Sequence, residues 1–194
     1  MKNPYEKCPV YANENYLLRP VESADAPELL RVYSDEGAVP LFNSDNCHGD
    51  DFHYTTLERM KEAIAFWDFS YKQKYFVRWS VVDKSTDTAV GTLELFCRRA
   101  EDYFNNCGIL RLDLRSDYEQ EEKIFEILSL IVPSAFALFE CEMLATKVPP
   151  FASERKKAVE RTGFSATKEP LIGGEDRKVY TDYYVCFQKG SAAP

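Results

Sequence analysis

The sequence predicts an α/β (α+β) domain in which a mixed sheet of six to seven strands is flanked by about four helices. Two observations support this prediction. Segments with alternating apolar and polar residues, typical of strands, occupy the middle and the end of the chain. Segments with apolar residues at every third or fourth position, typical of helices, lie before and between them. The predicted order is β-α-α-β-β-β-α-β-α-β.

Chain length and charge restrict the class of protein. The chain has 194 residues, 45% of them hydrophobic, which is enough for one domain with its own core. We expect a single domain over residues 1–194, with its core in about 16–188. The formal net charge is -8, whereas nucleic-acid-binding proteins need a basic surface. The best basic cluster, 155–157 with Arg161, lies on one short predicted helix, so we expect no nucleic-acid partner.

The N-terminus and the cysteines bear on location. The segment MKNPYEKCPVY lacks the apolar region of a signal peptide, and no apolar run approaches membrane-spanning length. The six cysteines contain no CxxC pair, and several lie in apolar strand-like or helical segments. We therefore expect reduced thiols, a cytoplasmic protein and no membrane partner.

The N-terminal part predicts one strand and two helices. YLLRPV (16–21) predicts the first strand, and the segment after it predicts a helix over about 23–34, with Pro27 near its start. Residues 37–56 are rich in turn-forming residues and predict an irregular connection. A second helix is expected over 56–71, where apolar residues recur along one face.

The middle of the chain predicts a hairpin, a third strand and a long helix. FVRWSVVD (76–83) and TAVGTLELF (88–96) alternate on either side of a KSTD turn. CGILRLDL (107–114) alternates in the same way. Apolar residues at helical spacing follow it, and Pro133 predicts a kink near Ser129 in that helix.

The C-terminal part predicts a further strand, a short helix and a last strand. CEMLATKV (141–148) reads as a strand that a Pro-Pro pair ends, and 152–163 predicts a helix with Gly163 at its C-terminus. RKVYTDYYVCFQ (177–188) predicts the last strand. A further short strand is expected around Phe164.

These elements and several local signatures resemble the GNAT superfamily of acetyl-CoA-dependent N-acetyltransferases. Within it, the ribosomal-protein N-terminal acetyltransferases are the most similar subgroup. YLLRPVESADAPELLRVYSD is similar to the family's opening strand and helix. VRWSVVDKSTDTAVGTLELF is similar to its hairpin, with Gly91 where the family has a glycine. AVERTGF (158–164) and the final DYYVCF are similar to its closing helix and last strand. The resemblance covers about Tyr16 to Gln188 and implies a mostly antiparallel sheet.

The resemblance also implies an activity. The expected reaction is transfer of an acetyl group from acetyl-CoA to an amine, carried by a small molecule or a peptide N-terminus. In this superfamily the variable loops set the acceptor, and here these are 37–56 and 98–106. The protein is expected to be a monomer or a homodimer, since the edge of the last strand offers a pairing surface.

The cofactor loop departs from the family pattern. Family members bind the pyrophosphate with the backbone amides of a glycine-rich loop at a helix N-terminus, and here the family's glycines fall on Gln120 and Glu122. A carboxylate about 6 Å from a phosphate charge is repelled by roughly 3 kcal/mol at an effective dielectric of about 20. A micromolar ligand has only about 8 kcal/mol of binding free energy. The cofactor-binding positions that the resemblance implies are Leu112, Leu114, Glu119, Gln120, Glu121, Glu122, Lys123, Ile124 and Arg155.

Two interpretations of this loop remain open. The chain is an acetyltransferase, or it is a catalytically impaired GNAT-like module that binds a ligand or protein partner without acetyl transfer. The acidic residues also have a structural explanation: SDYE is a capping box in which Ser116 accepts from a backbone amide and Glu119 reaches back. Carboxylates in a first turn also complement the helix dipole. Other positions of the family's site carry Ala152, Arg155 and Val159 here, the last in place of a frequent tyrosine acid.

Amine acetylation needs a base for the ammonium and an acid for the leaving group. Glu94 and Asp113 lie on the polar faces of adjacent predicted strands, where two close carboxylates can raise one pKa. Tyr184 is a candidate phenol near the cofactor sulfur. In the alternative interpretation, the carboxylates face solvent and pair with Arg111 or Arg98, and the tyrosine belongs to the core.

The segment DNCHGDDFHY (45–54) contains both histidines of the chain. His48, His53 and Asp50 or Asp51 are possible metal ligands, but their spacing matches no standard zinc pattern, so no metal is expected. We expect this segment to cover the substrate end of the cleft as a lid or acceptor-binding loop, with acidic residues suited to a cationic amine.

Overall fold

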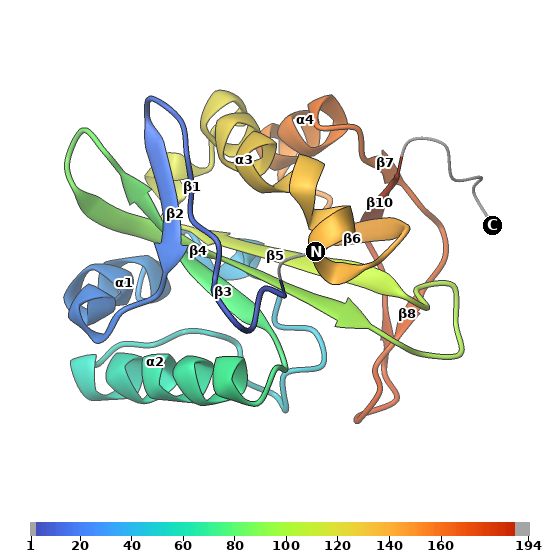
Figure 1. Ribbon diagram of the computed structural model, residues 1–194, viewed down its shortest axis with the longest axis horizontal. Coiled ribbons are helices and arrows are strands. Elements are labelled where there is room, and N and C mark those ends of the chain that lie inside the picture. Colours follow the sequence, from blue (N-terminus) through green and yellow to red (C-terminus); the bar gives the residue numbers. More distant parts are fainter. Residues whose placement is uncertain (1–2, 189–194) are drawn as a thin grey trace.

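A twisted sheet runs through the protein, with helices on both faces (Figure 1). The structure, a computed structural model, describes residues 3–188. The main sheet has eight strands in the order β1-β2-β3-β4-β5-β6-β10-β7, and β8 and β9 form a separate two-stranded sheet. The strands are β1 (Tyr11–Ala12), β2 (Tyr16–Pro20), β3 (Val77–Asp83), β4 (Thr88–Arg98), β5 (Cys107–Leu114), β6 (Met143–Lys147), β7 (Ser165–Ala166), β8 (Leu171–Ile172), β9 (Val179–Tyr180) and β10 (Tyr183–Phe187).

Two helices cover each face of the sheet (Figure 1). One face carries α3 and α4, and the other carries α1 and α2. The helices are α1 (Ala26–Tyr33), α2 (Leu57–Lys72), α3 (Glu121–Phe139) and α4 (Ser153–Arg161), with single 3-10 turns η1 (Ser23–Asp25), η2 (Val39–Leu41) and η3 (Ser116–Tyr118). No helix in the described part of the chain is long and apolar enough to cross a membrane.

The alternating sequence of the central strands sends opposite chemistries to the two faces. On β4, Leu93 and Leu95 join the core under α3 and α4. Between and beside them, Thr92 and Glu94 point to the face of α1 and α2 and are buried polar residues. The same alternation on β3 and β5 gathers a polar layer between the sheet and the first two helices.

The predicted elements are present, and the differences are local. The structure confirms the short strand expected near Phe164, which is β7, and the helix end at Gly163, whose φ is +96°. The last strand is shorter than predicted, because the chain turns at Asp182, whose φ is +67°. Strand β1 and the small β8–β9 hairpin were not predicted. Each of these three strands has only two residues.

The capping box predicted before the long helix is wrong. Ser116 lies in η3, and its carbonyl, rather than its side chain, accepts from the amide of Glu119. The helix begins later, at Glu121, with Gln120 as an N-cap whose side chain donates to the carbonyl of Asp117 and does not cap a helix amide. The predicted capping interaction fails because the Glu119 carboxylate is bound by Arg155 from α4.

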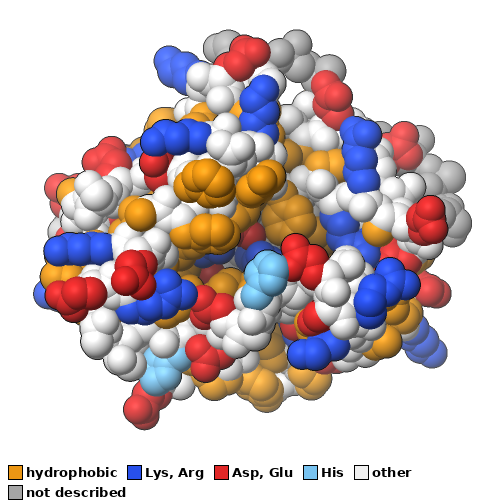
Figure 2. Space-filling view, turned by 90° about the horizontal axis from the view of Figure 1, so that it is seen from below, with side chains coloured by type: hydrophobic (Ala, Val, Ile, Leu, Met, Phe, Trp, Pro, Cys, Tyr) orange, Lys and Arg blue, Asp and Glu red, His pale blue; other side chains and the backbone are white. Residues whose placement is uncertain are grey.

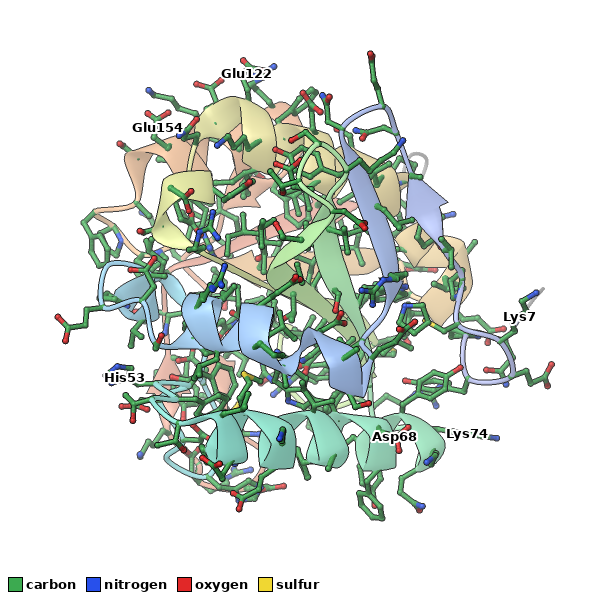
Figure 3. All side chains as sticks on the ribbon, turned by 90° about the vertical axis from the view of Figure 1, so that its left-hand side faces the viewer. Lys7, His53, Asp68, Lys74, Glu122 and Glu154 are labelled. Carbon is green, nitrogen blue, oxygen red and sulfur yellow. The ribbon has the colours of Figure 1, made fainter. Side chains whose placement is uncertain are left out.

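The sheet opens between β5 and β6. These two strands pair in parallel only from Cys107 with Met143 to Leu110 with Thr146. Beyond that point, residues 111–114 of β5 pair with β4 alone within the described part of the chain. The N-termini of α3 and α4, near Glu122 and Glu154, lie together on one face of the sheet (Figure 3). At the opening, the backbone of residues 112 and 114 has no partner strand on the β6 side.

Candidate active site

A cavity of about 710 Å³ opens on the face of the sheet that α2 covers. Its walls are the segment 46–54 on one side and α2 with residues 75–76 on the other. Its floor consists of Arg78, Glu94 and Arg111, from β3, β4 and β5. Figure 2 shows this hollow with apolar side chains around it, basic side chains in its depth and a histidine with acidic side chains at its rim. The volume lies within the range of small-molecule sites.

Arg78 is the centre of the floor. Its guanidinium lies 2.5 Å from Glu94 Oε2 and 3.2 Å from Asp113 Oδ2. Its Nη1, the nitrogen that lies near Asp113, also donates to the hydroxyl oxygens of Tyr33 (2.8 Å) and Thr92 (3.0 Å). These residues come from α1 and three neighbouring strands, so one buried cation fixes their relative positions.

Arg111 joins this network to the loop before α2. Its Nη1 donates to Glu94 Oε1 at 2.8 Å, and its Nη2 donates to the carbonyl of Asp45 at 2.8 Å. The Asp45 carboxylate accepts from Lys147 Nζ at 2.6 Å and from the Tyr183 hydroxyl at 3.0 Å. The irregular loop is therefore tied to β5, β6 and β10 at the floor of the cavity.

The two expected carboxylates have opposite pKa shifts. Burial alone would raise the pKa of Glu94, but the guanidinium groups of Arg78 and Arg111 hold it below its ordinary value. Burial raises the pKa of Asp113 above its ordinary value, although Arg78 and the Tyr33 hydroxyl oppose the change. Glu94 is thus a stable anion, and Asp113 is the better proton acceptor of the two.

The structure brings two of the three predicted catalytic residues together. Glu94 and Asp113 are both 1% exposed and are linked through Arg78. The idea that they face solvent is wrong, although the predicted pairing of Glu94 with Arg111 is present. Arg98, the other partner considered, binds Asp102 instead.

Tyr184 lies on the opposite face of the sheet. Its ring is buried in the core beneath α3 and α4, the same face as the opening between β5 and β6. It also borders a separate cavity of about 480 Å³ beside Pro149 and Pro150. It is therefore separated by the sheet from Glu94 and Asp113.

Arg78 and Tyr33 are two members of the site that were not predicted from the sequence. Arg78 shows the same pattern as Glu94, a charged residue on the polar face of an alternating strand, but only carboxylates were considered as catalytic candidates there. Tyr33 is the last residue of α1, and nothing in its local sequence distinguishes it from a core tyrosine. Its role depends on contacts with residues 45 and 80 positions away.

Aromatic rings enclose the Arg78 guanidinium. Its Cζ lies 4.3 Å from the ring centre of Trp67 and 5.8 Å from those of Phe52 and Phe76. Such cation–π contacts are strongest where water is excluded. The guanidinium of Arg78 therefore already contacts the faces of these rings.

The charged residues at the rim are paired with one another. Arg59 lies 2.7 Å from Asp50 and stacks over Tyr54, and His48 lies 2.9 Å from Glu175. His53, the other histidine, is exposed. Residues 3–188 contain no group of three or more His, Cys, Asp or Glu side chains that could hold a metal ion.

Two backbone amides at the N-terminus of α3 are open. The amides of 119–120 bond to carbonyls of the preceding turn, and the Glu121 amide donates to Glu154 Oε2 at 3.3 Å. The amides of Glu122 and Lys123 have no acceptor in the described part of the chain. Open amides at a helix N-terminus suit a phosphate group.

Cations from α4 partly neutralise the carboxylates that flank these amides. Arg161 Nη1 lies 2.7 Å from Glu121 and 2.6 Å from Glu122, and Lys157 Nζ lies 2.8 Å from Glu154. Figure 3 shows Glu122 and Glu154 at the adjoining ends of α3 and α4, on the far side of the sheet from α2. The repulsion expected from the sequence is therefore smaller than isolated carboxylates would produce.

One ion pair is buried beside these amides. Arg155 Nε donates to Glu119 Oε2 at 3.1 Å, and Arg155 Nη1 donates to the carbonyl of Leu41 at 3.1 Å. Arg155 is a buried residue, and only 8% of the Glu119 side chain is exposed. Arg155 is thus held by this chain's own groups.

At the remaining predicted cofactor positions, only backbone groups are available to contact a ligand. The side chains of Leu112, Leu114 and Ile124 are buried in the core under α3 and α4. The backbone at 112 and 114, however, lies in the unpaired stretch of β5. The unpaired strand backbone and the two open amides are donors and acceptors that suit a coenzyme A-type ligand, and Gln120 and Glu122 replace the expected glycines without closing those amides.

Comparison with known proteins identifies the type of domain. The family model described as an acetyltransferase (GNAT) domain matches residues 15–165. No curated protein matches this chain.

Solved structures share the fold at low sequence identity. A ribosomal-protein-S5-alanine acetyltransferase from Vibrio fischeri has a TM-score of 0.68 at 16% identity, covering 96% of this chain and 99% of that one. RimJ of Mycobacterium smegmatis, in complex with CoA-disulfide, has a TM-score of 0.72 at 11% identity, covering 99% and 94%. RimL, a ribosomal alpha-N-protein acetyltransferase in complex with coenzyme A, has a TM-score of 0.67 at 11% identity, covering 94% and 100%.

Proposed function

We propose that this chain, which belongs to the GNAT acetyltransferase family, acetylates the amino group of an acceptor that enters the cavity beside α2. Family membership carries the reaction type, and the geometry of the cavity supports the place of the acceptor. The comparisons give no support to the alternative of a domain that has lost acetyl transfer.

The observation that carries the proposal is the position of Arg111. It lies in the floor of the cavity. It also directly follows Leu110, the last residue of β5 that pairs with β6. The cavity thus lies next to the opening between β5 and β6, and we propose that donor and acceptor approach each other at this residue.

The face of the sheet that carries α3 and α4 would hold the acyl donor. When bound, acetyl-CoA supplies the acetyl group as a thioester. The open amides of Glu122 and Lys123, the free backbone at 112 and 114, and the guanidinium of Arg155 are the groups of this chain suited to hold it. For Arg155 to contribute, its bonds to Glu119 must exchange for bonds to the ligand.

The acceptor must lose a proton before its nitrogen can form the new bond. Glu94 lines the cavity but is bound by two arginines, so we propose that it positions Arg111 and the acceptor. Asp113, whose pKa is raised, is the proposed proton acceptor; Tyr33 and Arg78 hold it directly behind the floor of the cavity. Tyr184 remains a proposed acid on the face of the sheet that carries α3 and α4.

The acceptor class and the setting are finer proposals. The similar structures named above are acetyltransferases of ribosomal proteins by their names, which supports a peptide N-terminus over a free small amine as the acceptor. The six cysteines are all unpaired, as expected for a cytoplasmic protein. The monomer or homodimer expected from the sequence stays a proposal.

Acetylation of peptides with free and blocked N-termini tests this function. Purified protein is incubated with acetyl-CoA, and the products are measured by mass spectrometry. We expect one acetyl group on free N-termini only. Glu94→Gln should lower the rate by about 10²-fold, because Arg111 and the acceptor lose the group that positions them, whereas Glu101→Gln, at an exposed position outside the cavity, should not change it. Circular dichroism verifies that each variant is folded. No acetylation, or equal rates in both variants, would contradict the proposal.

A further inference from the structure

We propose that the cavity selects acceptors that carry a large apolar or aromatic group next to the amine. This inference rests on the proposed function and adds the property by which acceptors are distinguished. Two observations carry it: the charges that line the cavity are already paired, and the aromatic surface at its mouth is free.

The carboxylates at the rim already have partners within the protein. Asp50 is bound by Arg59, and Glu175 lies 2.9 Å from His48. Tyr54 also donates to Asp50, at 3.0 Å. A cationic acceptor would therefore compete with groups of this chain for both carboxylates.

The charges in the floor cancel in the same way. Glu94 accepts from Arg78 through one oxygen and from Arg111 through the other. Asp113, with its buried carboxylate, balances the remaining guanidinium charge. Asp45 and Asp50 of the segment 45–54, which on sequence grounds suited a cationic substrate, thus meet cations of this chain instead.

Aromatic side chains at the mouth of the cavity remain uncovered. Phe66 on α2 is 56% exposed, Tyr75 just after that helix is 61% exposed, and both line the cavity. Phe66 lies against Phe76, with ring centres 6.4 Å apart. Exposed aromatic side chains grouped at a cavity mouth are typical of a binding surface rather than of ordinary protein surface.

An apolar group placed here would bury both its own surface and that of the rings. The gain scales with the apolar area removed from water. A polyamine or a lysine side chain would bury less apolar area, in its methylene groups only, and each carboxylate among the lining residues already has a partner in this chain. The cavity volume of about 710 Å³ leaves room for an aromatic side chain together with the adjoining amine and one peptide unit.

A peptide series that varies only the first residue tests this selectivity. The peptides begin with Phe, Leu, Ala, Lys or Asp, and acetyl transfer from acetyl-CoA is followed by mass spectrometry. Phenethylamine serves as a free amine with the same aromatic group and distinguishes a small-molecule acceptor from a peptide. We expect kcat/KM for the Phe peptide to exceed that for the Ala and Lys peptides by about tenfold or more.

A matched pair of variants places the effect at the cavity mouth. Phe66 and Phe151 are 56% and 66% exposed, but only Phe66 lines the cavity. Phe66→Ala should raise KM for the Phe peptide with little change in kcat, because it removes ground-state binding. Phe151→Ala should leave the preference for Phe over Ala unchanged.

The outcomes separate this inference from the proposed function. Transfer to all peptides at similar rates, or fastest transfer to the Lys peptide, would overturn the selectivity and leave the function standing. Transfer to no peptide would contradict the function. Selectivity is then decided by binding, since Trp67 lines the cavity and its fluorescence should respond to the Phe peptide at lower concentration than to the Lys peptide. Equal titrations would overturn it.

Discussion

Glu94 lies between two guanidinium groups in a place from which water is excluded. Breaking such a buried pair leaves an uncompensated charge, which is far more costly than the net benefit of the intact pair. The same contacts lower the pKa of Glu94, so its contribution to stability depends on pH. This residue therefore offers a stability test that is independent of catalysis.

Glu94→Gln should destabilise the protein by about 3–5 kcal/mol at pH 7. The folded-state pKa lies below the unfolded value of about 4.3. The stability that ionised Glu94 contributes is thus present above that value and is lost as pH falls through the folded-state pKa. The difference between the variant and the unmodified protein should shrink as pH falls below about 4. Urea unfolding at several pH values measures it.

Asp113→Asn is the matched control in the same network. The pKa of Asp113 is raised, so the stability linked to this residue falls as pH rises from its unfolded to its folded pKa. The asparagine variant should therefore cost less than Glu94→Gln at neutral pH. A larger loss for Asp113→Asn would contradict the assignment of Glu94 as the stable anion.

Single residues were the hardest part to predict from the sequence. Glu94 and Asp113 were identified because charged residues in alternating strands are conspicuous. Their burial was not predicted, because it depends on Arg78 and on the covering ring of Trp67, which come from other elements. Sequence alone does not show which side chains of different elements meet.

Among the elements, the β4–β5 pair depends on a glycine. A Cβ at Gly91 would lie 2.3 Å from the carbonyl oxygen of Asp113 and 2.6 Å from a side-chain carbon of Leu114. The first contact is with backbone, which cannot move without distorting β5. The expectation of a glycine at this position thus has a packing reason.

Gly91→Ala should destabilise the protein by about 1–3 kcal/mol or more, because the added methyl group overpacks the strand pair. Gly174→Ala is the control, since a Cβ there would meet no heavy atom within 4 Å. Its effect should stay within about 0.5 kcal/mol. Thermal unfolding of both variants gives the comparison. Equal thermal unfolding midpoints for the two variants would contradict this prediction, because β5 would then have shifted to accommodate the added methyl group.

Elements with strong periodicity were predicted well, and short or tertiary-dependent ones were not. The hairpin and the long helices follow from local pattern. The β1 strand has two residues and exists because it pairs with β2 at Leu17 and Leu18. The start of α3 was misplaced because Arg155, distant in sequence, binds the glutamate that a local cap would have used.

At the scale of the whole molecule, the sheet separates two half-sites. The cavity proposed for the acceptor lies on the face of α2 (Figure 2), and the open amides at the start of α3 lie on the face of α3 and α4 (Figure 3). Arg111, in the floor of the cavity, is the first residue of β5 beyond its pairing with β6. The order of elements predicted this architecture, whereas the charge balance around α3 was evident only when α4 was placed beside it.

Calorimetric titration with acetyl-CoA tests most directly the claim that this architecture serves acetyl transfer. We predict binding in the micromolar range, about 8 kcal/mol. Glu122→Gly should tighten it by removing a carboxylate beside an open amide, and Arg155→Met should weaken it. Glu142→Gln, at an exposed position away from both half-sites, should leave it unchanged. Absence of binding by the unmodified protein and by Glu122→Gly would contradict this claim. The open amides of α3 and the unpaired backbone of β5 would then not bind coenzyme A.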